Sequence, residues 1–139
     1  MLLKQRTRTK SSIAFLFSAT LLFKCGCSSG QENSGAINLK PEEFQQLVSE
    51  KKGILVDVRT PAEFQESHIA GALLMNYYDP DFDDRACGLD TLKSILVYCR
   101  SGNRSSKAAA LFTRCGFSRV YHLTGGLNAW NKEGLPVER

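Results

Sequence analysis

Short apolar runs alternate with longer segments of mixed polarity along most of the chain. The runs have the length and composition of buried strands, and strands are predicted at 54–56, 72–75, 92–98 and 119–123. Between them lie predicted helices at 41–50, from 61 onwards and at 105–115. An acidic, aromatic loop that can hold one helical turn is predicted at 77–88. Nearly all-apolar strands that alternate with helices are typical of parallel sheets. The pattern therefore predicts an α/β fold with a central parallel sheet and helices on both faces.

Local signals mark where these helices begin and end. Thr60-Pro61-Ala62-Glu63 has the form of a capping box with proline at the first helical position, so a short helix should begin directly after the strand 54–56. We expect Arg59 and Glu63 to pair near its start and to hold this turn in place. Gly116 lies where the helix 105–115 would need an αL residue to close it.

A cysteine stands at one of the junctions between a strand and a helix. Cys99 ends the apolar run that precedes the helix 105–115. Because the first N–H groups of a helix lack intrahelical partners, they favour an anion nearby, and that anion could be the Cys99 thiolate. Gly102 permits positive φ, so that successive N–H groups can point inward, and Arg100 and Arg104 add positive charge. These features predict a reactive thiolate in a cup for a small anion; the alternative is a buried, inert cysteine.

Three segments carry motifs of a known family. They are Cys99-Arg100-Ser101-Gly102-Asn103-Arg104-Ser105, the segment 57–72 with Asp57, Arg59, Glu63 and His68, and Gly125-Gly126-Leu127-Asn128-Ala129-Trp130. The first resembles the active-site loop of the rhodanese family, particularly its single-domain sulfurtransferases. The second resembles the family signature D-x-R-x-x-x-E-[FY]-x-x-G-H-I-x-G-A, with Ser67 where glycine is usual, and the third resembles its closing G-G-x-x-x-W. The likeness runs from about Ile37 to Val137.

This resemblance implies a rhodanese-like fold and a sulfurtransferase activity. The Cys99 thiolate would attack the outer sulfur of thiosulfate or a similar small anionic donor, sulfite would leave, and a persulfide on Cys99 would pass its sulfur to cyanide or a thiol. The N–H groups of a surrounding loop would stabilise that sulfur; the loop residues are Arg100, Ser101, Gly102, Asn103, Arg104 and Ser105. Family members that prefer mercaptopyruvate resemble C-G-S-G-V-T here, so Cys-Arg-Ser-Gly favours thiosulfate. No cofactor is expected besides the covalent persulfide.

Four residues of the second motif are expected to support the site rather than to react. They are Asp57, Arg59, Glu63 and His68. We expect His68 to be a hydrogen-bonded packing residue, because a thiolate that its loop has already ionised needs no general base. Trp130 of the third motif should pack into the core.

Three other functions remain open for the same loop. Phosphatases and arsenate reductases of the Cdc25 type resemble C-x5-R, whereas Cys99 to Arg104 is C-x4-R. Many rhodanese-like domains are thought to be non-catalytic binding modules, although such a module does not require Cys99, Gly102 and Arg104 together. A thiol redox carrier would use the same thiolate as a persulfide enzyme.

The N-terminal segment differs in composition from the rest of the chain. The whole chain has a formal net charge of +4, but residues 1–26 contain five basic residues and no acidic one. The remainder is close to neutral, so we expect no nucleic-acid partner. A basic start followed by the apolar stretch 13–23 is the layout of an export signal, and this stretch is too short to span a bilayer.

The end of this leader resembles a bacterial lipoprotein signal. Gly26-Cys27 fits a small residue before a cysteine that becomes lipidated, although Lys24 stands where leucine is usual. We expect lipid attachment at Cys27, with a cleaved soluble form and a retained N-terminal anchor as alternatives. Attachment would place the protein in a bacterial cell envelope, on the periplasmic side and anchored to the membrane. The predicted organisation is a leader at 1–26, a Gly/Ser/Asn-rich tether at 27–36 and one domain at 37–139, expected as a monomer.

Two further cysteines, Cys87 and Cys115, lie in the predicted domain. In an oxidising compartment they could bridge, but the sequence alone does not place their Cα atoms within range. No C-x-x-C or Cys/His spacing suggests a zinc site, so we expect no metal.

Overall fold

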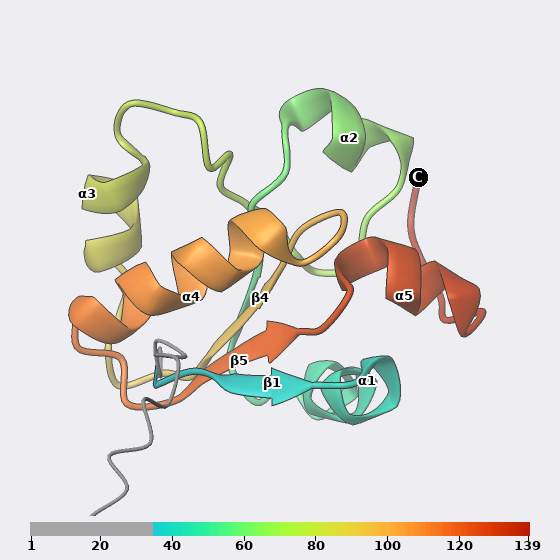
Figure 1. The fold of residues 1–139 in the computed structure, drawn as a ribbon, viewed down its shortest axis with the longest axis horizontal. Helices are drawn as coiled ribbons and strands as arrows, with labels where there is room; N and C mark the ends of the chain where they lie inside the picture. The colour runs from blue at the N-terminus through green and yellow to red at the C-terminus, as the bar shows by residue number, and fades with distance from the viewer. Residues whose placement is uncertain (1–34) are drawn as a thin grey trace, which may run out of the picture. The chain divides into compact units, whose positions relative to one another are not determined.

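The structure, a computed structural model, describes residues 35–139, and the predictions for the leader and for Cys27 lie outside these residues. Strands and helices alternate along the described chain (Figure 1). The strands are β1 (Ile37–Leu39), β2 (Ile54–Asp57), β3 (Leu73–Leu74), β4 (Ile95–Tyr98) and β5 (Val120–Leu123). The helices are α1 (Pro41–Ser49), α2 (Pro61–Glu66), α3 (Phe82–Cys87), α4 (Asn103–Arg114) and α5 (Gly126–Lys132). No helix within 35–139 is long and apolar enough to cross a bilayer.

The five strands form one parallel sheet in the order β1-β5-β4-β2-β3. β4 lies at its centre, and all four of its residues are buried. Because every strand runs the same way, the carboxyl ends of β2, β4 and β5 meet at one edge, where open α/β sheets hold their ligands. Cys99 follows β4 at this edge.

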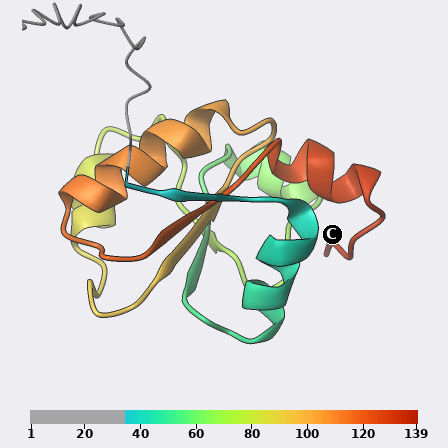
Figure 2. The same cartoon turned by 60° about the horizontal axis from the view of Figure 1, so that its bottom comes forward.

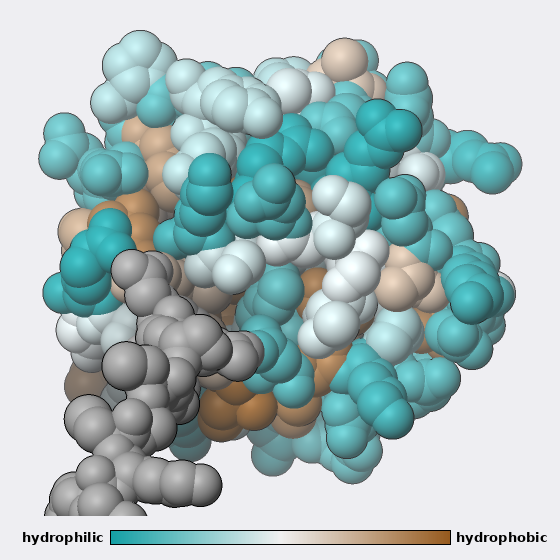
Figure 3. All heavy atoms as spheres, in the orientation of Figure 1, coloured by the Kyte–Doolittle hydropathy of each residue, from teal (hydrophilic) through white to brown (hydrophobic). Residues whose placement is uncertain are grey.

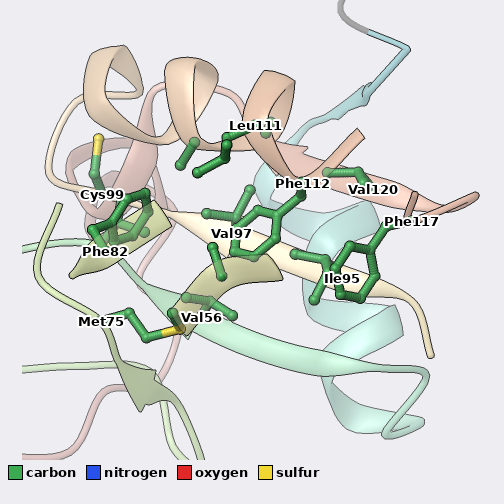
Figure 4. Close-up of a cluster of buried hydrophobic side chains, with 14 residues drawn as sticks. Val56, Met75, Phe82, Ile95, Val97, Cys99, Leu111, Phe112, Phe117 and Val120 are labelled. Atoms are coloured by element: carbon green, nitrogen blue, oxygen red, sulfur yellow. The ribbon is translucent and has the colours of Figure 1, made fainter. Parts of the chain in front are cut away.

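Helices cover both faces of the sheet, as the sequence pattern predicts. Alternate residues of β4 point to opposite faces: Ile95 and Val97 belong to the buried cluster under α3 and α4, and Leu96 and Tyr98 to the cluster with α1 and α5. Figure 2 shows α4 and α1 on opposite sides of the strands. Figure 4 shows the first cluster packed beneath α4, with Cys99 at one end of it. The predicted α/β fold is therefore confirmed.

The predicted helix ends are present. The Thr60 hydroxyl accepts a hydrogen bond from the Glu63 N–H at 3.3 Å, and the Glu63 carboxylate accepts one from the Thr60 N–H at 3.0 Å. This reciprocal pair is a capping box, and it starts α2 directly after β2. Gly116, at φ +96°, follows the last turn of α4. Trp130 is buried in the cluster with α1 and α5.

Two predicted boundaries are wrong by a few residues. The strand predicted at 92–98 begins at Ile95, because Asp90 holds a turn: its carboxylate accepts from the Leu92 N–H and its carbonyl from the Lys93 N–H. Leu92 is consequently 87% exposed. The helix predicted from 105 begins at Asn103, because Gly102 turns the chain at φ +98° and the helix can start at once.

One strand has no counterpart in the sequence-based prediction. β1 is three residues long and mostly exposed at the edge of the sheet, so it has no apolar run to reveal it. It pairs with β5, with Asn38 opposite His122. Hydrophilic residues cover most of the molecular face drawn in Figure 3, and apolar residues show between them in its lower part.

Cys87 and Cys115 form a disulfide with a Cα–Cα distance of 5.0 Å. Cys87 is the last residue of α3, and Cys115 is the C-cap of α4. The bridge joins the C-terminal ends of these helices on one face of the sheet. The sequence alone left open whether these two cysteines lie close enough to bridge, and the structure shows that they do.

Candidate active site

The site is built on residues 99–105, here called the Cys99 loop. Cys99 comes directly after β4 and is 1% exposed. Its sulfur points towards the first turn of α4 (Figure 4). The sulfur accepts a hydrogen bond from the Gly102 N–H at 3.1 Å and one from the Ser105 hydroxyl at 3.3 Å. The loop therefore presents donors to the sulfur, as an anion requires.

These donors outweigh the effect of burial on the Cys99 thiol. Burial raises the pKa of Cys99, but hydrogen bonds from the Ser105 hydroxyl and from the N–H groups of Ser105, Ser101 and Gly102 hold that pKa below its usual value. A lower pKa increases the thiolate fraction near neutral pH, and the thiolate is the nucleophilic form. The geometry therefore fits the predicted reactive thiolate better than an inert cysteine.

The glycine pair after β5 allows α5 to approach the Cys99 loop. The Cys99 carbonyl accepts a hydrogen bond from the Leu127 N–H at 2.8 Å, and the Arg100 carbonyl accepts one from the Asn128 N–H at 3.0 Å. A Cβ atom on Gly126 would lie 2.4 Å from the Cys99 carbonyl oxygen, and φ at Gly126 is +59°. Only glycine fits at this position without displacing the loop.

Arg104 and Glu63 form an ion pair between the first turns of α4 and α2. The two terminal nitrogens of Arg104 donate to the two carboxylate oxygens of Glu63, at 2.7 and 2.8 Å. This pairing, assisted by hydrogen bonds from Thr60, lowers the pKa of Glu63 to about 2 despite the opposing effect of burial. The Arg104 guanidinium carbon lies 5.7 Å from the ring centre of Tyr78. Arg104 thus fastens the loop to α2.

The predicted pair between Arg59 and Glu63 is wrong. Arg59 instead folds back onto Asp57 and donates to both of its carboxylate oxygens at 2.7 to 3.0 Å. Asp57 is fully buried at the end of β2, so a neighbouring cation compensates for the cost of burying its charge. Because Arg59 pairs with Asp57, the carboxylate of Glu63 is free to pair with Arg104, which is 41 positions away in the sequence.

Ser67 takes the place of the usual glycine without strain. Its backbone is extended, with φ −172°, a conformation open to any residue. Its carbonyl accepts a hydrogen bond from Arg59 at 2.6 Å. The next residue, His68, has its Nδ1 3.0 Å from the Phe64 carbonyl oxygen, and its ring stacks on Phe64 at 3.8 Å between centres. These contacts are those of a packing residue.

The remaining loop residues lie at the rim of the site. Arg100, Ser101 and Asn103 are exposed. Arg100 lines a cavity of about 390 Å³ beside the loop. The other lining residues are mostly polar and come from 59–67 and from α5: Arg59, Glu63, Glu66, Ser67, Leu127, Asn128 and Asn131. A small polar molecule could approach the loop from this side.

One buried polar residue behind the loop was not predicted from the sequence. His122 on β5 is 8% exposed, and its Nε2 lies 3.0 Å from the Ser105 hydroxyl oxygen. The sequence feature that could have pointed to His122 is its position, because it is a titratable residue inside the apolar run 119–123, near the carboxyl end of the predicted strand. Among residues 35–139, no cluster of three His, Cys, Asp or Glu side chains could hold a metal ion.

Comparison with known families decides the relationship of this chain. The family model of the rhodanese-like domain matches residues 40–133. The chain belongs to the rhodanese-like domain family. The match includes the Cys99 loop and the segments 57–72 and 125–130, which are the three places where the chain resembles the family motifs.

Several relatives are named sulfurtransferases. The chain is 37% identical over 93 residues to a sulfurtransferase of Allochromatium vinosum, covering 67% of this chain and 85% of that protein. It is also 37% identical over 93 residues to the chloroplastic thiosulfate sulfurtransferase 16 of Arabidopsis thaliana, covering 60% of this chain and 78% of that protein. By contrast, the chain spans 59% of slr1261 of Synechocystis, to which it is 39% identical over 112 residues.

Solved structures agree with the fold. The BH2092 protein of Bacillus halodurans is 31% identical, with a TM-score of 0.64 over 74% of this chain and 77% of that chain. The domain thus has the rhodanese-like architecture of these solved structures, and its sequence relatives include proteins named sulfurtransferases.

Proposed function

We propose that the domain is a thiosulfate sulfurtransferase that works through a persulfide on Cys99. The thiolate attacks the outer sulfur of thiosulfate or a similar donor. The bond between the two donor sulfurs breaks, and its electron pair leaves on sulfite. The outer sulfur keeps its negative charge on Cys99 until a nucleophile, cyanide in an assay or a thiol in the cell, removes it. No cofactor takes part in this cycle.

The observation that carries this proposal is the set of donors around the Cys99 sulfur. The Gly102 N–H and the Ser105 hydroxyl already hydrogen-bond to the sulfur, and the pKa of Cys99 is lowered. The first N–H groups of α4 lack partners within the helix, so they can stabilise the charge of an outer sulfur as an oxyanion hole would. Relatives named as sulfurtransferases and as a thiosulfate sulfurtransferase add support.

Arg100 is the loop residue best suited to attract a dianionic donor. It is exposed beside the polar cavity, whereas both terminal nitrogens of Arg104 are occupied by Glu63. This difference also argues against a phosphatase. An arginine that binds phosphate through two parallel hydrogen bonds needs a guanidinium group that is free to face the phosphate oxygens. Arg104 would first have to leave Glu63.

Mass spectrometry of the intact protein tests the proposal. Thiosulfate should add the mass of one sulfur atom to the wild type and none to Cys99→Ser, which should also lose thiosulfate:cyanide activity. Ser106→Ala is the matched control, because this serine directly follows the loop and is exposed. An equal mass gain in Cys99→Ser would refute the assignment. Faster hydrolysis of a phosphate ester than transfer of sulfur would favour the phosphatase instead.

We further propose that the domain is held outside the cytoplasm by lipid on Cys27. The basic start, the short apolar stretch and Gly26-Cys27 support this, and the disulfide between Cys87 and Cys115 fits an oxidising compartment. Since stable anchoring takes two lipid signals, the cysteine should be diacylated.

Membrane fractionation of a bacterial host that expresses the full chain tests the anchor. The wild type and the control Cys25→Ala should partition with membranes, and Cys27→Ala should not. If all three are soluble, or if all three stay bound, lipidation at Cys27 is wrong.

A further inference from the structure

His122 links the Cys99 loop to the edge strand β1. Its Nδ1 lies 2.9 Å from the side-chain oxygen of Asn38, and its Nε2 lies 3.0 Å from the Ser105 hydroxyl oxygen and 3.1 Å from the Gly102 carbonyl oxygen. The Ser105 hydroxyl in turn lies 3.3 Å from the Cys99 sulfur. β5, which carries His122, lies between β1 and β4 in the sheet (Figure 1). The side chains therefore form an unbroken chain of polar contacts that ends at the sulfur.

We propose that His122 receives the proton of the Cys99 thiol, with Ser105 as the bridge and Asn38 as the support of the charged imidazole. The thiol proton passes to the Ser105 oxygen as the hydroxyl proton of Ser105 passes to Nε2 of His122. A thiol and a neutral imidazole become a thiolate and an imidazolium, Ser105 stays neutral, and the net charge is unchanged. His122 is thus a positioning residue that acts on Cys99 through Ser105.

The partners of the ring favour the protonated form. A carbonyl oxygen can only accept a hydrogen bond, and each ring nitrogen faces one: Nδ1 faces Asn38 and Nε2 faces Gly102. An imidazole that donates from both nitrogens is an imidazolium. Burial lowers the pKa of His122 and the bond to Gly102 raises it, with a net lowering, so the cation needs an anion close by. The Cys99 thiolate is that anion.

In the described part of the chain, the groups that lie within hydrogen-bond distance of the His122 ring carry no charge. Asn38 of β1 and Ser105 and Gly102 of the Cys99 loop are uncharged. Arg104, the charged residue in the first turn of α4, is paired with Glu63. The titratable group that the polar chain reaches is the thiol of Cys99.

The use of this proton in turnover rests on the proposed sulfur transfer. After thiosulfate has delivered its outer sulfur, His122 keeps the proton opposite the negative persulfide. When cyanide removes that sulfur as thiocyanate, the thiolate returns and the proton can go back to it through Ser105. The charges balance in each half of the cycle, and each half ends with a buried anion facing a buried cation.

Alkylation of Cys99 tests the relay without requiring any sulfur transfer. The full chain is treated with iodoacetamide, a neutral reagent, over a range of pH, and the tryptic peptide 94–100 reports the reaction at Cys99 alone. His122→Gln, which fills similar space but accepts no proton, should raise the apparent pKa of Cys99 by about one unit. Below that pKa the alkylation rate should fall about tenfold. An unchanged midpoint would overturn the proposal.

Asn38→Ala provides a second variant, since Asn38 is exposed on the edge strand and its truncation should leave the fold intact. It should raise the same pKa by a smaller amount and add nothing to His122→Gln. Tyr121→Phe is the control, because Tyr121 precedes His122 on β5 and packs into the cluster with α1 and α5. If both variants slow alkylation equally at every pH, His122 merely shapes the loop and the proposal fails. If His122→Gln raises the apparent pKa of Cys99 as expected but the wild type transfers no sulfur, the proton relay is supported and the proposed function is refuted.

Discussion

The two ends of α4 each lie next to a cysteine. The cysteine at the N-terminal end is a free thiol, and the one at the C-terminal end is in a disulfide. At the N-terminal end the sulfur of Cys99 accepts hydrogen bonds from the Gly102 N–H and the Ser105 hydroxyl. At the C-terminal end Cys115 is the C-cap, and its sulfur is joined to Cys87. Because the N-terminal end of a helix favours negative charge and the C-terminal end disfavours it, a thiolate is stabilised only at the first.

The two ends are also fastened to the rest of the domain by different means. An ion pair with Glu63 ties the first turn of α4 to α2, and a covalent bond ties its last turn to α3. The ion pair lies beside the reacting sulfur, whereas the disulfide lies a helix length away. The difference teaches that the disulfide can be removed without touching the donors around the reacting sulfur, whereas the ion pair contributes both to stability and to the geometry of the site.

Removing the disulfide should have the largest effect on stability. The bridge spans a sequence separation of 28, for which the chain-entropy account gives about 3.5 kcal/mol. Cys87→Ala/Cys115→Ala should lose about that much free energy of unfolding, as measured by urea denaturation. Its sulfur-transfer activity while folded should change less than about twofold, because the Cys99 loop keeps its donors. Cys99→Ser serves as the control, with activity lost and the disulfide kept; a large activity loss in the double variant would contradict the separation.

The ion pair at the other end should make stability depend on acid. Glu63 has a pKa of about 2 in the folded chain against an ordinary value of 4.5. Its contribution is therefore complete above pH 4.5 and is lost as the pH falls towards 2. Because solvent screens this partly exposed pair, at pH 7 the wild type should exceed Glu63→Gln by about 1 to 2 kcal/mol in free energy of unfolding, and the two should converge near pH 2.

Denaturant titrations at several pH values would measure this difference. Glu66→Gln is the control, because Glu66 is exposed on the same helix. A gap between wild type and Glu63→Gln that stays constant from pH 7 to pH 2 would show that protonation of Glu63 is not its cause.

Lengthening the Cys99 loop should have the smallest effect in free energy but should change the chemistry. With four residues between Cys99 and Arg104, we expect the N–H groups to fit one sulfur atom. A glycine inserted after Ser101 should lower thiosulfate:cyanide activity by at least about tenfold, or roughly 1.4 kcal/mol of transition-state stabilisation, and phosphate-ester hydrolysis should appear or rise.

An insertion after Thr91 is the matched control, since it lengthens an exposed turn before β4. Circular dichroism should show that both variants are folded. Unchanged sulfur transfer in the Ser101 variant would mean that loop length does not select the reaction.

The sequence by itself determined the features that depend on neighbouring residues. The apolar runs predict the core strands β2, β4 and β5 and the edge strand β3, and Thr60 with Glu63 predicts the start of α2. The order of elements at the Cys99 loop is also predicted, because a strand, a glycine and a helix N-terminus are consecutive there, but the helix begins at Asn103 and not at 105. Such features are local, since hydrogen bonds between residues three or four apart and a few φ angles decide them.

Only the tertiary structure decided which distant residues meet. Glu63 pairs with Arg104 rather than with nearby Arg59, and Asn38 meets His122 across 84 positions of sequence. Both contacts depend on the strand order β1-β5-β4-β2, which brings the carboxyl ends of separate strands to one edge. An apolar run shows that a strand is buried but not which strand lies beside it, so these partners could be found only once the sheet was assembled.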